Sequence, residues 1–263
     1  MLRTLNDIKL FMLDMDGTFY LDNQLLPGAL EFLHTAESQG ISYLFLTNNS
    51  SKSNADYVQK LAAIGVKVTP QQIFTSGDAT LSYMQHHYTE KEIVLVGTPS
   101  LQQQFTQAGY NVNAAHPCAV VLGFDTTLNY EKLTLLCNAV RSGLPYIATH
   151  PDFNCPVQGG YIPDIGATIA YVKAATGREP DVIIGKPNGY IAKAAADKFN
   201  LPLQQIAMVG DRLYTDIALG KCGVATVLVL SGETTAADLN ASDIVPDFVY
   251  DNLAGLEKAL KKA

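Results

Sequence analysis

The feature that most constrains the fold is a regular alternation of short apolar runs with longer amphipathic stretches along all 263 residues. Strands that alternate with helices form a largely parallel sheet, because each connection must cross back over the sheet. Strands in such a sheet are covered on both faces and are almost continuously apolar. Four runs have this character: residues 9–13, 42–46, 206–209 and 226–230. The sequence therefore predicts an α/β fold.

Polar segments directly follow the first three of these runs. They are residues 14–18, 47–50 and 210–216. A fourth polar segment brings Lys186 and Pro187 to the start of a predicted helix, where proline is tolerated. In an open parallel sheet, ligands bind beyond the carboxyl ends of the strands. We therefore expect these segments to meet at one edge of the sheet and to form a ligand site.

The acids in these segments predict a magnesium site, and two of them are suited to attack on phosphorus and to proton transfer. Carboxylates gathered at one edge repel each other and are costly to desolvate, so a divalent cation is the simplest way to hold them together. Oxygen ligands without a His or Cys cluster favour Mg²⁺ over zinc. A carboxylate can attack phosphorus, and a second carboxyl can protonate the leaving oxygen and then activate water. Asp14 and Asp16, separated by one residue, are spaced to share these two tasks.

Taken together, the motifs resemble those of the haloacid dehalogenase superfamily of aspartate-nucleophile phosphotransferases, and the resemblance covers the whole chain. The four motifs of that superfamily occur in order as Asp14-x-Asp16-Gly17-Thr18, Thr47-Asn48, Lys186-Pro187, and Gly210-Asp211 with Asp216 five residues later. One Asp-x-Asp alone is weak evidence, because it also occurs in calcium loops, but four motifs in the expected order are specific. The sequences TNNS and GKP, with the long insert between them, resemble the NagD-like or p-nitrophenyl phosphatase branch.

The resemblance implies a Rossmann-like three-layer core with a central parallel sheet and an inserted α/β cap domain. The insert has its own alternation of apolar runs and amphipathic stretches, which is more than a crossover requires. We expect the catalytic core to comprise residues 1–79 and 180–263, and the cap to comprise residues 80–179. In this family, a cap covers the active site, excludes water and contacts the substrate.

The resemblance also assigns roles to the core residues. Asp14 is the nucleophile and Asp16 the general acid and base. Mg²⁺ is held by the side chain of Asp14, the backbone carbonyl of Asp16 and the carboxylate of Asp211, while Asp216 lies behind these ligands. This assignment is chemically consistent, because Asp16 can be protonated only if its side chain does not bind the metal.

Further residues are implied as contacts of the substrate. Thr47 and the amides of Asn48 and Asn49 would hold phosphoryl oxygens, and Lys186 would neutralise charge and keep Asp14 ionised. In the cap, the Pro- and Gly-rich segment 150–164 is predicted as a loop that contacts the leaving group. Its polar candidates are His150, Asp152, Asn154 and Cys155. An ordinary connecting loop is an equally open interpretation of this segment.

A short hairpin is predicted between the first motif and the next helix. Residues 19–21 and 24–26 flank Asp22 and Asn23, and these two residue types favour a tight turn.

Charge and composition narrow the choice of partners. A net charge of −7 and a pI near 5.1 disfavour a nucleic-acid backbone or an anionic membrane. The apolar N-terminal run is interrupted by Asp7, Lys9 and Asp14, which argues against a signal peptide, and we expect a cytoplasmic protein. The four cysteines lack paired metal-ligand spacing and are expected to be reduced. A homodimer is an option that the resemblance suggests.

The predicted function is that of a Mg²⁺-dependent phosphatase. Its substrates would be small phosphorylated metabolites, such as nucleoside monophosphates or sugar phosphates, and p-nitrophenyl phosphate, hydrolysed through an aspartyl-phosphate. A non-enzymatic phospho-acceptor or a phosphometabolite-binding protein is the alternative, and a phosphomutase also stays open. The second acid, Asp16, and the long insert count against a receiver-like phospho-acceptor, which needs neither. The physiological substrate is not readable from these motifs.

Overall fold

The computed structural model describes residues 4–157 and 159–262, which divide into two compact units. The first unit comprises the described residues of Met1–Thr47, Tyr57–Phe74 and Lys186–Ala263. The second comprises those of Asn48–Asp56 and Thr75–Gly185. Residues 1–3 and 263 of the predicted core, and residue 158 of the predicted cap, lie outside the described residues.

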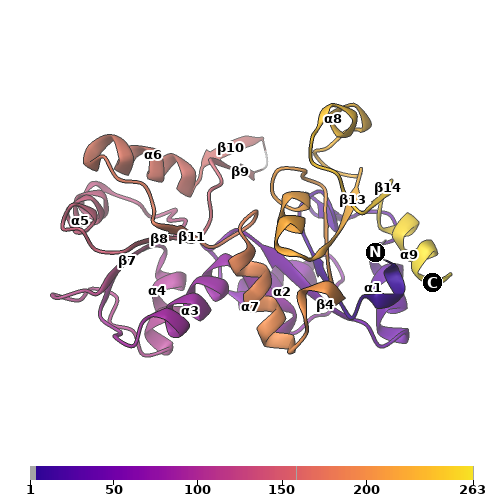
Figure 1. Cartoon of the computed structure of the whole chain (residues 1–263), viewed down its shortest axis with the longest axis horizontal. Helices are drawn as coiled ribbons and strands as arrows, with labels where there is room; N and C mark the ends of the chain where they lie inside the picture. Colours follow the sequence, from indigo (N-terminus) through magenta and orange to yellow (C-terminus); the bar gives the residue numbers. More distant parts are fainter. Residues whose placement is uncertain (1–3, 158, 263) are drawn as a thin grey trace. The chain divides into compact units, whose positions relative to one another are not determined.

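A parallel sheet of six strands organises the first unit, in the order β14-β13-β12-β1-β4-β5 (Figure 1). β1 (Leu10–Leu13) pairs in parallel with β12 (Ile206–Gly210) and with β4 (Ser42–Thr47). β13 (Ala225–Val229) pairs in parallel with β12 and with β14 (Phe248–Tyr250), and β5 is Ile73–Thr75. The four apolar runs therefore form four adjacent strands, and the predicted α/β fold is confirmed.

Helices cover this sheet because its strands are apolar on both faces. α1 (Ala29–Ser38) and α9 (Leu253–Leu260) lie side by side and bury their apolar residues in one core with Phe11 and Leu13 of β1 (Figure 1). The ring of Phe32 in α1 meets that of Phe11 edge to face, with centroids 5.1 Å apart. The alternate residues of β1, Leu10 and Met12, are equally buried, so the opposite face is covered as well.

The other helices have the following bounds. α2 is Asn54–Ala63, α7 is Gly189–Phe199 and α8 is Ala236–Ala241. The short 3₁₀ helices are Leu5–Asp7, Pro70–Gln72, Leu203–Gln205 and Ile217–Cys222. α7 begins directly after Asn188, as the Lys186-Pro187 segment predicts.

The hairpin predicted after the first motif is confirmed. β2 (Tyr20–Leu21) pairs antiparallel with β3 (Gln24–Leu25). Asp22, in the turn, has a φ of 54°, a left-handed conformation that Asp tolerates better than most residues.

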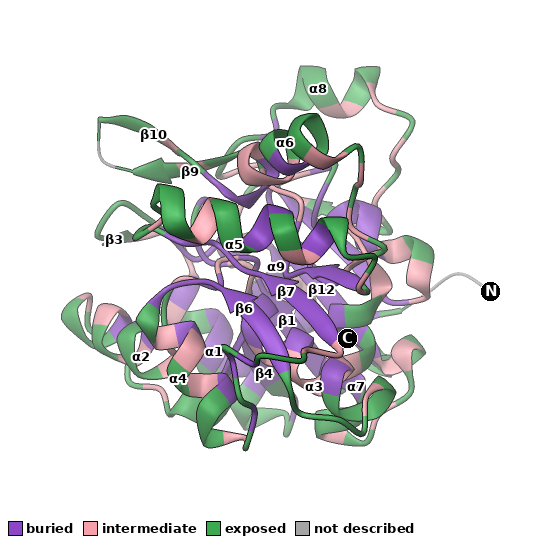
Figure 2. Cartoon of the chain, turned by 90° about the vertical axis from the view of Figure 1, so that its left-hand side faces the viewer, coloured by how far each residue is buried: buried purple, intermediate pink, exposed green. Residues whose placement is uncertain are grey.

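The second unit contains a four-stranded parallel sheet in the order β11-β8-β7-β6. Its strands are β6 (Ile93–Val96), β7 (Ala119–Leu122), β8 (Tyr146–Ala148) and β11 (Val182–Ile183). α5 (Tyr130–Arg141) and α6 (Ile165–Thr176) share one core with this sheet. Figure 2 shows the strands buried and the outward face of α5 exposed. α3 (Ser76–His87) and α4 (Pro99–Gln107) complete the unit.

The segment predicted as a loop, residues 150–164, contains a two-stranded hairpin. β9 (Asn154–Val157) pairs antiparallel with β10 (Gly160–Pro163). Pro156 and Pro163 suggested a loop, but a ribbon of only two strands has free edges at which a missing N–H is tolerated. Gly159 supplies the left-handed residue of the turn, with a φ of 84°.

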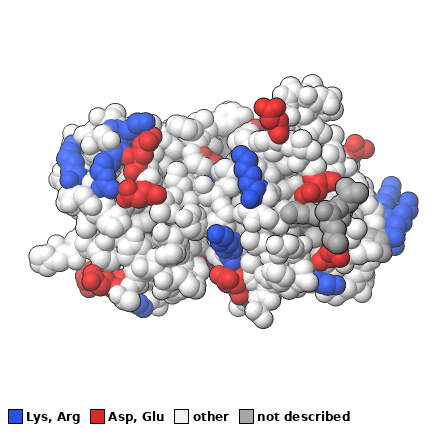
Figure 3. Space-filling model, in the orientation of Figure 1, with Lys and Arg blue, Asp and Glu red and all other residues white. Residues whose placement is uncertain are grey.

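Two global properties bear on partners. Among the helices of the described residues, none is long and apolar enough to cross a bilayer. On the face drawn in Figure 3, basic and acidic side chains lie next to one another in several places.

Candidate active site

The site begins at the carboxyl end of β1, where Asp14 follows four buried residues. The Asp14 N–H donates to the carbonyl of Val209 in β12, at 2.9 Å, so its backbone continues the ladder of the sheet. Carboxylate oxygens of Asp14, Asp211 and Asp216 all lie within 4.8 Å of one another. The structure thus brings together three of the four acids that the sequence singled out.

Lys186 lies against two of these acids. Its Nζ is 2.5 Å from Oδ1 of Asp14 and 2.7 Å from Oδ1 of Asp216, and only 4% of its side chain is exposed. Burial lowers the pKa of Lys186, but the charges of Asp14 and Asp216 outweigh this effect and raise the pKa above its ordinary value. The buried ammonium therefore stays charged.

Asp211 is oriented by donors from two distant segments. Thr18 donates its hydroxyl to Oδ1 at 3.2 Å, and the backbone N–H of Glu233 donates to Oδ2 at 2.7 Å. Two glycines make room for this carboxylate: a Cβ at Gly17 would lie 2.4 Å from Oδ2, and a Cβ at Gly232 would lie 2.0 Å from it. Any side chain at either position would displace Asp211.

Asp216 is buried and held from its own turn. Its Oδ2 accepts a hydrogen bond from the N–H of Arg212 at 3.1 Å. Burial raises the pKa of both Asp211 and Asp216, and the charge of Asp14 adds to the effect, while Lys186 opposes it at Asp216. The charge of Arg212 also opposes the shift at Asp211, but this guanidinium forms an ion pair with Glu233 at 2.9 Å. The three carboxylates with Lys186 therefore keep an excess of negative charge.

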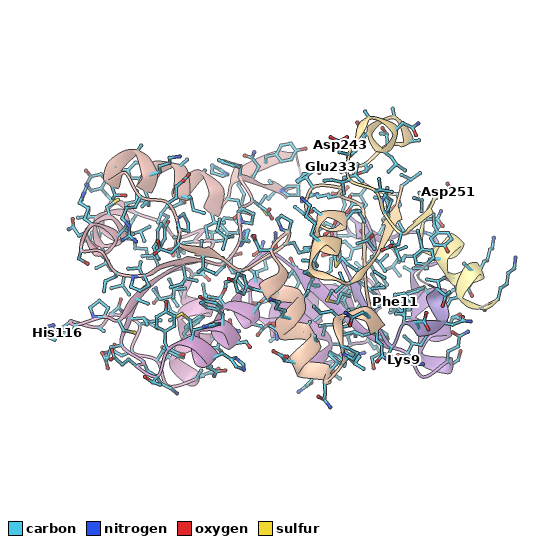
Figure 4. All side chains as sticks on the ribbon, in the orientation of Figure 1. Lys9, Phe11, His116, Glu233, Asp243 and Asp251 are labelled. Atoms are coloured by element: carbon cyan, nitrogen blue, oxygen red, sulfur yellow. The ribbon has the colours of Figure 1, made fainter. Side chains whose placement is uncertain are left out.

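This donor set fits a divalent cation. All three groups offer hard oxygen ligands, and a doubly charged ion would relieve the repulsion that, in addition to burial, raises the pKa values of Asp211 and Asp216. Figure 4 shows the two ends of the first unit: Lys9 and Phe11 mark the start of β1, whereas Glu233 lies toward α8. The acids follow the carboxyl ends of β1 and β12, as expected for a ligand site of a parallel sheet.

Asp16 lies outside this group of three side chains. Its side chain is 52% exposed, and its Oδ2 accepts a hydrogen bond from the hydroxyl of Tyr20 at 3.3 Å. Lys60 of α2 is 3.6 Å from Oδ1. Partial burial of the carboxyl group raises the pKa of Asp16, and the charge of Lys60 counteracts this shift.

The predicted phosphate-binding segment is divided between the two units. Thr47 ends β4 in the first unit, whereas Asn48 and Asn49 belong to the second. The Asn48 side chain donates to Oδ2 of Asp152 at 3.0 Å, and Nδ2 of Asn49 is 3.8 Å from the sulfur of Cys155. The shared phosphate-binding role of these residues stays a prediction.

The predicted selectivity residues of the second unit have different surroundings. His150 is fully buried: its Nε2 is 3.0 Å from Oδ1 of Asp164, and its Nδ1 is 3.0 Å from the hydroxyl of Thr149. Asn154 on β9 is exposed, and Cys155 and Asp152 are half-buried. Contact of these four residues with a substrate also stays a prediction.

Several neighbours of the acids were not singled out from the sequence. They are Tyr20, Lys60, Gly232 and Glu233. A signal for the last two was present, because Ser231-Gly232-Glu233 directly follow the fourth apolar run, just as the predicted motifs follow the other runs. Tyr20 and Lys60 carry no comparable signal, since they meet Asp16 only through the fold.

A parallel α/β sheet with clustered carboxylates and a buried lysine beyond its strands is typical of hydrolases whose active site is built from aspartate side chains. Family profiles agree: one for haloacid dehalogenase-like hydrolases matches residues 11–111, and one described as HAD-hydrolase-like matches residues 183–256. The chain is 33% identical to the acid sugar phosphatase of Staphylococcus epidermidis over 254 residues, which are 94% of this chain and 98% of that protein.

Solved structures point the same way. The 4-nitrophenylphosphatase of Thermotoga maritima superposes with a TM-score of 0.93 at 49% identity, covering 97% of this chain and 98% of that one. NagD of E. coli K-12 gives a TM-score of 0.87 at 32% identity, covering 94% and 97%. The chain therefore belongs to the haloacid dehalogenase-like hydrolases, in the branch of NagD and the p-nitrophenyl phosphatases. It is a phosphoric monoester hydrolase of that family, and the family resemblance predicted from the motifs is confirmed.

Proposed function

We propose that this phosphatase hydrolyses small phosphorylated metabolites through an aspartyl-phosphate formed on Asp14, with Mg²⁺ as its cation. The observation that carries the proposal is the buried contact of Lys186 with Asp14, at 2.5 Å, beside Asp211 and Asp216. An ammonium at this position neutralises charge beside the nucleophile, so that an anionic phosphoryl group can approach.

Each half of the reaction uses the same two aspartates. An oxygen of Asp14 attacks phosphorus, the bond from phosphorus to the leaving oxygen breaks, and Asp16 gives that oxygen a proton. Water then attacks the phosphorus of the aspartyl-phosphate, Asp16 takes a proton from the water, and the Asp14 carboxylate leaves with inorganic phosphate as the product. The half-exposed carboxyl of Asp16 lies outside the three-acid cluster, which suits it to exchange protons.

The cation would be held by the side chains of Asp14 and Asp211 and by the backbone carbonyl of Asp16. When bound, it supplies positive charge that stabilises the oxygens of the transferred phosphoryl group. Asp216 holds Lys186 in place through a second ion pair, at 2.7 Å. The oxygen-only donor set supports Mg²⁺ over zinc.

Substrate recognition is assigned to residues beyond the core acids. Thr47, Asn48 and Asn49 would hold phosphoryl oxygens. The predicted cap, residues 80–179, belongs to the second unit. Its residues His150, Asp152, Asn154 and Cys155 would contact the leaving group. The acid sugar phosphatases among the relatives support sugar phosphates as the first substrates to test.

The test is phosphate release from a panel of sugar phosphates, nucleoside monophosphates and p-nitrophenyl phosphate, with and without Mg²⁺. Asp14→Asn removes the nucleophile, so we expect turnover to fall by at least about 1,000-fold. Asp7→Asn is the matched control, because exposed Asp7 precedes β1 at its other end. Phosphate release by Asp14→Asn at the rate of the control would overturn the proposed mechanism.

A further inference from the structure

The surroundings of Asp16 contain a short relay of side chains. The hydroxyl of Tyr20 lies 3.3 Å from Oδ2 of Asp16, and Nζ of Lys60 lies 2.7 Å from the same hydroxyl. All three residues belong to the first unit. The relay joins the hairpin strand β2 and the helix α2 to one carboxyl group.

The direction of the relay follows from the donors that each group has. An ammonium has only hydrogens to give, so Lys60 donates to the oxygen of Tyr20. The single hydroxyl hydrogen of Tyr20 is then available for Asp16. Lys60 also lies 4.3 Å above the centre of the Tyr20 ring, which places its charge over the aromatic face.

Burial makes Tyr20 a fixed donor. Its side chain is fully buried in the apolar core of the first unit, whereas the side chain of Asp16 is 52% exposed. Two backbone hydrogen bonds also fix the chain between these residues. The Gly17 N–H donates to the carbonyl of Tyr20 at 2.8 Å, and the Tyr20 N–H donates to the carbonyl of Met15 at 3.1 Å. An exposed carboxylate would otherwise sample several rotamers.

We infer that Tyr20 and Lys60 are positioning residues that hold Asp16 for proton transfer. The hydrogen bond from Tyr20 engages Oδ2, and the ammonium of Lys60 forms an ion pair with Oδ1 at 3.6 Å, so the two contacts fix the orientation of the carboxyl group. In the first half of the reaction, the O–H bond of the Asp16 carboxyl breaks as the leaving oxygen takes the proton and the electron pair of the broken bond to phosphorus. In the second half, the Asp16 carboxylate takes a proton from water.

The inference rests on the proposed role of Asp16, and a pair of matched substrates tests it. Phenyl phosphate needs protonation of its leaving oxygen more than p-nitrophenyl phosphate does, because phenolate is the poorer leaving group. Tyr20→Phe removes one hydroxyl and keeps the buried ring. We expect its kcat/KM to fall by about 10-fold for phenyl phosphate and by less than about 3-fold for p-nitrophenyl phosphate, since general acid catalysis as a whole contributes about 100-fold or more.

Lys60→Gln provides a second variant whose side chain is partly exposed, and Lys67→Gln makes the same change at an exposed position of the same unit. We expect Lys60→Gln to change the ratio of the two kcat/KM values in the same direction as Tyr20→Phe, and Lys67→Gln to leave it unchanged. In a relay, the double variant should lose no more than Tyr20→Phe alone. Thermal unfolding of each variant reports separately on folding.

The variant Asp16→Asn distinguishes a failure of this inference from a failure of the proposed acid role of Asp16. Equal losses by Tyr20→Phe on both substrates, or no loss on either, overturn the inference when Asp16→Asn still discriminates between them. If Asp16→Asn itself reduces both substrates equally, the proposed acid role of Asp16 is wrong. A double variant whose losses are the product of the single losses would show that Lys60 does not act through Tyr20.

Discussion

Each compact unit contains a cluster of three side chains that are close enough to hold a metal ion. Asp14, Asp211 and Asp216 form the cluster of the first unit, and the second consists of His150, Asp152 and Asp164. In both clusters, the candidate ligand atoms lie within 4.8 Å of one another. Proximity alone therefore does not distinguish them.

The charges of the grouped side chains do distinguish the two clusters: the first consists of three carboxylates, and the second of two carboxylates and an imidazole. In the second unit, each acid faces a donor: Asp164 accepts from the N–H of Ile165 at 2.6 Å and lies 3.0 Å from the ring of His150, and Asp152 accepts from Asn48. In that unit, the cluster caps α6 and anchors residue 48. In the first unit, the three carboxylates also accept hydrogen bonds, but they lie against one another, and burial with mutual repulsion raises the pKa of Asp211 and Asp216.

Mutual repulsion between carboxylates therefore marks a cation site better than the number of nearby ligand atoms does. A carboxylate held against two other carboxylates gains more from a metal ion than one that lies against an imidazole, because the ion relieves the repulsion between like charges. We therefore assign the cation to the first unit and a structural role to the second cluster. Variants of matched chemistry in the two clusters test this assignment.

The largest effect is expected for Asp211→Asn compared with Asp164→Asn. The first change removes a charged oxygen ligand, so activity at saturating Mg²⁺ should fall by about 100-fold or more. The second leaves the acid cluster of the first unit intact, so the Mg²⁺ concentration for half-maximal activity should change by less than about 3-fold, well below a typical outer-shell effect. A strong rise in the Mg²⁺ requirement of Asp164→Asn would reverse the assignment of the two clusters.

A smaller effect is expected for Gly232→Ala. Its new Cβ would lie 2.0 Å from Oδ2 of Asp211, so the carboxylate must move. We expect the Mg²⁺ concentration for half-maximal activity to rise by about 10- to 100-fold, the range of changes in the support of a metal ligand. Gly255→Ala in α9 is the control, because its new Cβ would come no closer than 3.2 Å to an atom outside the helix, Cβ of Tyr250. Equal behaviour of the two variants would remove the argument from close approach.

The smallest effect on the Mg²⁺ requirement is expected for His150→Gln, which tests the second cluster. Gln cannot reproduce both contacts of the buried ring, so the free energy of unfolding should fall by about 1–3 kcal/mol while the Mg²⁺ requirement stays unchanged. His116→Gln, at an exposed position of the same unit, should change neither (Figure 4). Thermal unfolding and a Mg²⁺ titration measure the two quantities. A stable His150→Gln variant with a changed Mg²⁺ requirement would contradict the structural role.

Local pattern was enough to predict the four adjacent strands β13, β12, β1 and β4, but not the two short strands at the edges of the sheet, β5 and β14. A strand covered on both faces needs a continuous apolar run, so residues 9–13 and 206–209 predicted β1 and β12 without knowledge of their partners. The hairpin at Asp22 is equally local, because turn preferences act between near neighbours. Prolines misled the prediction at β9 and β10, since their cost depends on whether a strand has a free edge.

The sequence by itself determined which chemical groups follow the strands of this protein: two spaced acids after β1, one lysine before α7 and two more acids after β12. Only the tertiary structure decided what holds them. Thr18 and Asp211 meet across 193 residues, Gly232 is required by the space that Asp211 occupies, and Lys60 contacts both Tyr20 and Asp16. These contacts leave no periodic trace in the chain, because hydrophobic patterning reports which face of an element is buried and not which distant side chain it meets.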